Sequence, residues 1–178
     1  MGNISYMMVD IETTGTTPGC GILTIGAVVF GLCGMPRPEF YKGIKWDPLN
    51  QDFSDERDTM NWWRQQDRSV ARLAFAGEYS YVEALLSFSK FIETARTGYR
   101  EFRIYANGAA FDFPIIEYAY RAMGIHIPWQ YHERQCYSTL KRHFPRIPKP
   151  KFIGNPHNAL DDAKNQAAHC EAILRIFS

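Results

Sequence analysis

An apolar run that ends in two acids places the strongest constraint on how this chain can fold. Residues Ile4–Val9 are rich in strand-forming side chains, and Asp10, Ile11 and Glu12 follow directly. Because side chains alternate across a strand, Asp10 and Glu12 project from one face while Ile11 projects from the other. We therefore expect a buried strand that carries two carboxylates on one of its faces.

A second acidic block, NGAAFD, follows another apolar segment. Residues Phe102–Ala106 are a strand candidate, and Asn107 and Gly108 are typical of a turn. Pro114 fits the first turn of a helix. We therefore expect Asp112 at a junction between strand and helix in an α/β unit, where active sites gather.

The third block, HNALDD, contains His157 and Asp162, which are five residues apart. On a regular helix they would point about 140° apart, so one helix cannot aim both at one site. The conflict disappears if Asn158 caps the helix and Asp161 completes a capping box. His157 is then predicted in the preceding loop and Asp162 in the second helical turn.

Each block also has an ordinary structural explanation. An Asp-x-Glu pair is common at an exposed strand end, Asp112 could cap a helix, His157 could be a loop histidine, and Asp161 suits a helix start. Carboxylates on one face repel each other unless a cation lies between them, and Mg²⁺ and Mn²⁺ prefer oxygen ligands. Taken together and in this order, the three blocks favour a metal-dependent hydrolytic nuclease.

The three blocks resemble the exonuclease motifs of the DEDDh 3′-5′ exonuclease family, within the ribonuclease H-like superfamily, and the resemblance spans nearly the whole chain. The segments DIETTGTTPGCGILTIGAVVF, TMNWWRQQ and PWQYHERQCYSTLKRHFP are similar to a small phage and bacterial branch. That branch includes phage exodeoxyribonucleases and the polyadenylate-trimming ribonuclease AS.

The resemblance implies roles for five residues. It makes the four carboxylates the ligands of two Mg²⁺ or Mn²⁺ ions about 3.5–4 Å apart, and it makes His157 the general base. The implied products are 5′-mononucleotides released from a 3′ end. The implied metal ligands are Asp10, Glu12, Asp112 and Asp162.

Two positions depart from the family pattern and concern substrate binding rather than chemistry. Many DEDDh enzymes carry an apolar residue where this chain has Thr16, and the phage branch often has Arg where it has Ser138. Aromatic side chains commonly stack on the bases of single-stranded ends. Our candidates for contacting substrate are Thr13, Thr16, Trp62, Asn107, Phe111, Lys149 and Lys151.

The chain is expected to form one domain over residues 1–178, because 46% of its residues are hydrophobic and no linker divides it. The predicted fold is an α/β, ribonuclease H-like one, with helices on both faces of a mixed five-stranded sheet formed by an antiparallel meander plus parallel strands. Predicted strands are Ile4–Val9, Leu23–Phe30, Phe40–Trp46, Phe102–Ala106 and Tyr131–Cys136. Predicted helices are Thr59–Gln65, Val82–Thr94, Pro114–Met123, Ser138–His143 and Ala159–Ile176.

Charge gives little support for a nucleic-acid partner, since the net charge is only +1. One acid-free segment of eleven residues is basic, and it either holds the substrate backbone or is a solvated loop. Its basic side chains are Lys141, Arg142, Arg146, Lys149 and Lys151.

The remaining expectations concern partners and location. The predicted partner is a single-stranded DNA or RNA 3′ end, and the alternative is a nucleic-acid-binding or assembly protein of the same fold without catalysis. No segment is apolar for long enough to cross a membrane, so we expect a cytoplasmic protein, and related small exonucleases suggest a homodimer. The cysteines, which show no zinc-site spacing, are expected to be free thiols: Cys20, Cys33, Cys136 and Cys170.

Overall fold

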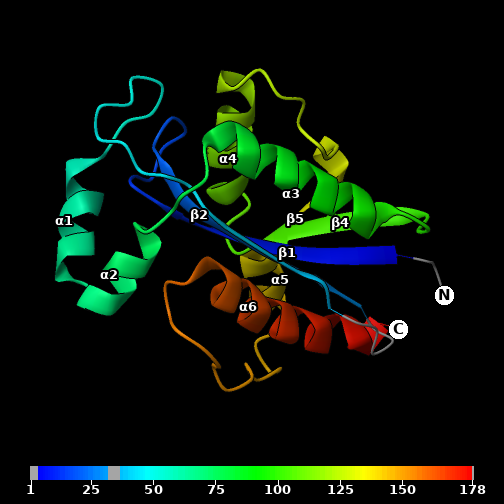
Figure 1. Ribbon diagram of the computed structural model, residues 1–178. Helices are drawn as coiled ribbons and strands as arrows, with labels where there is room; N and C mark the ends of the chain where they lie inside the picture. Colours follow the sequence, from blue (N-terminus) through cyan, green and yellow to red (C-terminus); the bar gives the residue numbers. More distant parts are fainter. Residues whose placement is uncertain (1–3, 32–36, 178) are drawn as a thin grey trace.

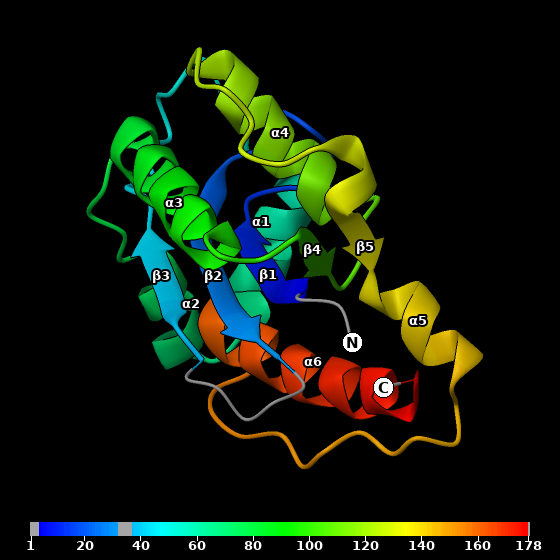
Figure 2. The ribbon, with the colours of Figure 1, turned by 90° about the vertical axis from the view of Figure 1, so that its right-hand side faces the viewer.

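The computed structural model describes residues 4–31 and 37–177, so the prediction for Cys33 falls outside the described residues. These residues contain a five-stranded sheet in the order β3-β2-β1-β4-β5 (Figure 1 and Figure 2). The strands are β1 (Ile4–Thr13), β2 (Ile22–Phe30), β3 (Glu39–Gly43), β4 (Glu101–Ala106) and β5 (Arg134–Cys136).

The pairing of the strands matches the predicted mixed sheet. Strands β1, β2 and β3 form the antiparallel meander, while β4 runs parallel to β1 and β5 runs parallel to β4. Strand β1 continues to Thr13 because β2 pairs with it to the end, with Glu12 opposite Thr24. Asp10 and Glu12 therefore lie within the central strand, where hydrogen bonds fix their direction.

Helices cover both faces of the sheet, as predicted. Figure 2 shows α3 and α4 on one side and α6 on the other. None of the helices in the described ranges is long and apolar enough to cross a bilayer. The helices are α1 (Arg57–Gln65), α2 (Arg68–Ala74), α3 (Tyr81–Arg96), α4 (Asp112–Ala122), α5 (Tyr137–His143) and α6 (Ala159–Leu174), with 3-10 turns at Tyr131–Glu133 and Arg175–Phe177.

The two faces of β1 enter two separate hydrophobic cores. Met7, Val9 and Ile11 pack in the core beneath α3 and α4. Tyr6 and Met8 pack in the core beneath α6. Continuing this alternation, Asp10 and Glu12 face the α6 side, so the same strand periodicity that builds the cores also directs both carboxylates toward α6.

Local structure differs from the predictions at several places, among them the end of β3, which lies at Gly43 rather than Trp46. Residues Tyr131–Glu133 form a 3-10 turn, and only Arg134–Cys136 pairs with β4. The short helix α2 was not predicted, although Asp67 caps it by accepting a hydrogen bond from the Ser69 N–H. Helix α6 ends at Leu174 rather than Ile176, because its last residues tighten into a 3-10 turn.

Helix α6 lies directly against β2 at Gly26. A Cβ atom on this residue would lie 2.2 Å from the Ala159 carbonyl carbon and from the Leu160 nitrogen. Ala163 and Ala167 continue the row of small side chains in the core beneath α6. This close approach brings the first turns of α6 to the edge of β1.

We expect Gly26→Ala to destabilise the protein by about 1–3 kcal/mol or more, because the new methyl group would meet helix backbone that cannot yield cheaply. Urea unfolding measures the change. Gly31→Ala is the matched control, since a Cβ atom at Gly31 meets nothing within 4 Å. Equal stabilities for the two variants would contradict this account of the packing of α6.

Candidate active site

Acids from separate parts of the sequence converge at the interface between β1 and α6. One carboxylate oxygen from each of Asp10, Glu12 and Asp162 lies within 4.8 Å of the others. Asp10 and Glu12 come from β1, and Asp162 comes from the first turn of α6, where the second turn was predicted. The Glu12 side chain is buried, so this cluster is not an ordinary exposed strand end.

Asp112 approaches the cluster from the start of α4, although it is not among the three acids within 4.8 Å of one another. It is the first residue of α4 and is buried, and its Oδ2 atom accepts a hydrogen bond from the Gly108 N–H at 3.2 Å. The predicted junction between strand and helix is thus confirmed. The Asp112 charge raises the pKa values of both Asp10 and Glu12, which places the residue within electrostatic reach of the cluster.

The cluster is electrostatically unfavourable in the protein alone. Burial, with the charge of Asp112 next, raises the pKa of Asp10 well above its usual value. Burial and then the charges of Asp162 and Asp112 raise the pKa of Glu12 to about 8. Burial raises the pKa of Asp112 to about 7, and burial also raises the pKa of Asp162. Within residues 4–31 and 37–177, none of the four forms an ion pair with a lysine or arginine. Converging carboxylates without a basic partner suit divalent cations.

His157 lies in the loop before α6, as predicted, and is anchored to the cluster through its backbone. Its N–H donates to Asp162 Oδ2 at 2.8 Å. Its φ of 63° is in the left-handed region, which is unusual for a residue with a side chain. The imidazole packs edge-on against Trp62, with ring centroids 4.9 Å apart.

The predicted capping box at α6 was half wrong. The Asn158 side chain does cap the helix, accepting from the N–H groups of Leu160 and Asp161. Asp161 does not bond back to Asn158, because its carboxylate instead accepts from the Asn155 N–H at 2.9 Å. The Asp161 carboxylate thus holds the loop that carries His157.

Four of the predicted substrate contacts line one cavity of about 350 Å³ next to Glu12. Trp62 lines this cavity and is partly exposed to solvent. Trp63 is buried and donates its indole N–H to the Thr13 carbonyl at 2.8 Å. Thr16 Oγ1 donates to Glu56 Oε2 at 2.9 Å, so this lining residue is held by a polar contact. The four residues are Thr13, Thr16, Trp62 and Phe111.

The other predicted contacts lie elsewhere. Asn107 and Lys149 line a second cavity, of about 230 Å³, which also includes Asp162. Asn107 therefore does not reach the cavity beside Glu12. Lys151 is exposed and lines neither cavity.

Sequence reasoning missed Gln166. Its Nε2 group donates to Asp10 Oδ1 at 2.8 Å, while its own Oε1 atom is buried without a hydrogen-bond partner. Gln166 follows Asp162 by four residues, so both side chains project from one face of α6. That spacing was a visible signal, but it does not by itself show that the opposite strand supplies an acceptor.

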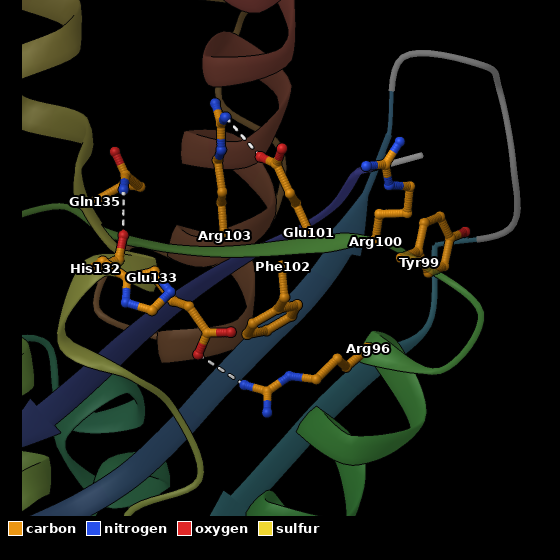
Figure 3. A pocket seen from close by; sticks show the side chains of 9 residues that line it. All are labelled: Arg96, Tyr99, Arg100, Glu101, Phe102, Arg103, His132, Glu133 and Gln135. Atoms are coloured by element: carbon orange, nitrogen blue, oxygen red, sulfur yellow. Dashed lines mark hydrogen bonds and ion pairs between the residues drawn. The ribbon is translucent and has the colours of Figure 1, made fainter. Parts of the chain in front are cut away.

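A larger cavity, of about 540 Å³, lies at the other end of the sheet, where β4 begins. Its acids differ from those of the cluster because each has an arginine partner (Figure 3). Arg103 pairs with Glu101 at 2.9 Å, and Arg96 pairs with Glu133 at 2.7 Å. Neutralised acids of this kind stabilise a surface and do not call for a metal ion.

The family model of the Rv2179c-like 3′-5′ exoribonuclease domain matches residues 5–174. The chain belongs to this family. The predicted class of enzyme is thereby confirmed, and the domain is a 3′-5′ exonuclease domain. No curated protein shows significant sequence similarity to the chain.

Solved structures agree with this exonuclease domain in fold. Cell-death related nuclease 4 (CRN-4) superposes with a TM-score of 0.68 at 16% identity, over 99% of this chain and 66% of the other. The nuclease domain of 3′hExo, a DEDDh family member bound to rAMP, gives 0.67 at 12% identity, over 98% of this chain and 93% of the other. The predicted α/β fold and the predicted 3′-5′ exonuclease family are confirmed. The homodimer and the cytoplasmic location stay predictions.

The raised pKa values predict how stability depends on pH in a chelator such as EDTA. The folded protein binds these protons more tightly than the unfolded chain, in which Asp and Glu have pKa values of 3.8 and 4.5. The contribution of these protonated acids to the free energy of unfolding is fully present below about pH 4 and is lost as the pH rises through about 7 to 8. We therefore expect these groups to lower the melting temperature between pH 5 and pH 8.5.

Glu12→Gln tests this prediction because glutamine carries no proton to lose. In EDTA, the melting temperature of the variant should fall less steeply over this pH range than that of the wild type. If the melting temperatures of the two proteins fell equally with pH, ionisation of Glu12 would not destabilise the folded protein.

Proposed function

We propose that this domain is a divalent-metal-dependent exonuclease that removes 5′-mononucleotides from the 3′ ends of single-stranded nucleic acid. The observation that carries the proposal is the convergence of three carboxylates within 4.8 Å of one another, with the charge of Asp112 acting on two of them and no basic partner for any of the four in the described residues. A fold that merely bound nucleic acid would gain nothing from such a repulsive cluster.

Asp10, Glu12, Asp112 and Asp162 would together hold two Mg²⁺ or Mn²⁺ ions. When bound, such ions lower the pKa of a water molecule and stabilise the negative charge of the phosphate and of the departing 3′ oxygen. The protein contributes the fixed placement of its carboxylates, set by strand pairing at β1 and by the packing of α6.

His157 is our candidate for the general base. It would accept a proton from the attacking water as the water oxygen bonds to phosphorus and the bond from phosphorus to the 3′ oxygen breaks. Two features support this role. The backbone of His157 is tied to Asp162, and the strained φ of 63° fixes where the side chain leaves the loop.

The cavity beside Glu12 is our candidate for the 3′-terminal nucleoside. Trp62 and Phe111 offer aromatic faces to a base. Asp58 and Thr59 bring oxygen atoms to the same cavity, and a 2′-hydroxyl is both a donor and an acceptor. Together with the family's description as exoribonucleases, this favours RNA as the substrate.

Digestion of single-stranded RNA and DNA oligonucleotides of one sequence, labelled at the 5′ or the 3′ end, tests the proposal. With Mg²⁺ or Mn²⁺ we expect a ladder from the 5′ label and immediate release of mononucleotide from the 3′ label, faster for RNA. EDTA should stop both. No cleavage of either polymer by the folded protein would favour the alternative, a binding or assembly protein without catalysis.

Variants divide the proposed roles. Asp10→Asn and Asp162→Asn should abolish activity with the fold intact. His157→Ala should slow turnover by about 10²–10⁴-fold but leave Mn²⁺ affinity, measured by calorimetry, near that of the wild type. Turnover near the wild-type rate by either Asn variant would remove the two-metal assignment.

Gln166 should act as a positioning residue for Asp10. Gln166→Leu removes the donor to Asp10 Oδ1 while keeping a side chain of similar size, so we expect kcat to fall about 10–100-fold together with weaker Mn²⁺ binding. Gln166→Glu, which places another acid beside Asp10, should be worse than Gln166→Leu. If both variants bound Mn²⁺ as the wild type does, the contact would be structural only.

A further inference from the structure

Two cavities border the acidic cluster and differ in the charge of the residues that line them. Glu12 lines the aromatic cavity, while Asp162 lines the smaller cavity of about 230 Å³. Among the described residues, no lysine or arginine lines the aromatic cavity. The smaller cavity carries two lysines, Lys141 and Lys149, and we call it the lysine cavity.

Lys141 is held in place before any ligand binds. It extends from α5, donates from Nζ to Asn107 Oδ1 at 3.1 Å, and lies over the Tyr137 ring at 4.8 Å from the centroid. The Tyr137 ring is itself buried, so the lysine rests on a rigid surface. Preorganised donors lose little freedom on binding and therefore bind more tightly.

The support beneath Lys141 also fixes the loop that carries Lys149. His169 Nε2 lies 2.9 Å from the Ile147 carbonyl oxygen, and because a carbonyl can only accept, this nitrogen carries the proton. The other ring nitrogen, Nδ1, then accepts from the Tyr137 hydroxyl at 2.6 Å. The buried Tyr137–His169 pair thus fastens α5, α6 and the segment two residues before Lys149 together.

The ammonium groups of Lys141 and Lys149 repel each other. Burial, and then the charges of Lys149 and Arg142, lower the pKa of Lys141. Within the described part of the chain, neither Lys141 nor Lys149 forms an ion pair with a carboxylate. A cavity that gathers positive charge in this way favours an anion that contacts both groups.

The difference between the cavities matches the polarity of a nucleic acid. Beyond the scissile phosphate, the 3′-terminal nucleoside ends in a hydroxyl and carries no further phosphate. On the upstream side every nucleotide adds a phosphate. An aromatic cavity without a cation suits the terminal nucleoside, and a cavity with two lysines suits the upstream strand.

We propose that Lys141 and Lys149 bind the phosphate one nucleotide upstream of the scissile phosphate, and that this contact orients the strand for cleavage from its 3′ end. The proposal rests on the proposed exonuclease function and adds a second phosphate site to it. Asn107 serves this site by holding Lys141.

Two dinucleotides that differ by one phosphate test the proposal. The dinucleotides are made with ribose or deoxyribose, whichever the wild-type protein prefers. The dinucleotide pApA has a 5′ phosphate upstream of its scissile bond, and ApA lacks it. We expect the wild type to prefer pApA by about tenfold or more in kcat/KM, because a charge-assisted contact of this kind is among the strong ones. Lys141→Met and Lys149→Met should each reduce this ratio several-fold, and the double variant should bring it near one.

Methionine keeps the apolar stem on the Tyr137 ring and removes only the charge, so the variants should fold. Lys141→Arg should restore most of the ratio. Lys42→Met is the matched control, since Lys42 also lies over a tyrosine ring, that of Tyr79, but is on β3 and lines neither cavity. Its ratio should equal that of the wild type.

The outcomes separate the two proposals. A wild-type protein that degrades oligonucleotides but shows a ratio near one, or a double lysine variant that keeps the wild-type ratio, would overturn the upstream phosphate site and leave the exonuclease function standing. A wild-type protein that cleaves neither the dinucleotides nor longer strands would overturn both.

Discussion

Repulsion among buried and half-buried carboxylates is the physical constraint that the rest of this structure must meet. Asp10, Glu12 and Asp162 lie within 4.8 Å of one another, and Asp112 adds its charge to theirs. Isolated carboxylates would avoid such an arrangement, so the fold must supply the energy that holds it. It does so with two hydrophobic cores, one on each face of β1.

The same packing determines what surrounds the cluster. Helix α6 reaches β1 only because Gly26 has no side chain where the helix begins. From that helix come Asp162, the support for the His157 loop, and Gln166, whose amide orients Asp10. The contacts of α6 therefore fix the acidic cluster and its surroundings as one unit, and Gly26, the strand partner of Asp10, is part of that packing.

Much of the site could be predicted from the sequence because the positions of its residues depend on local periodicity. Alternation along β1 put Asp10 and Glu12 on one face, and the junction of strand and helix placed Asp112. Geometry within one helix separated His157 from Asp162. The errors occurred where a side chain or a backbone group has several possible hydrogen-bond partners. Asp161 bonds to Asn155 instead of closing a capping box, and Tyr131–Glu133 tightens into a 3-10 turn.

The sequence by itself determined the family, the order along the chain of the strands and of the helices other than α2, and the five residues proposed for chemistry, since these follow from short-range patterns and motif blocks. Only the tertiary structure decided which cavity each substrate candidate lines, that Gln166 meets Asp10, and that Lys141 and Lys149 share one cavity. Such pairings join residues far apart in the chain. They depend on how closely helices pack on the sheet, which a linear pattern does not record.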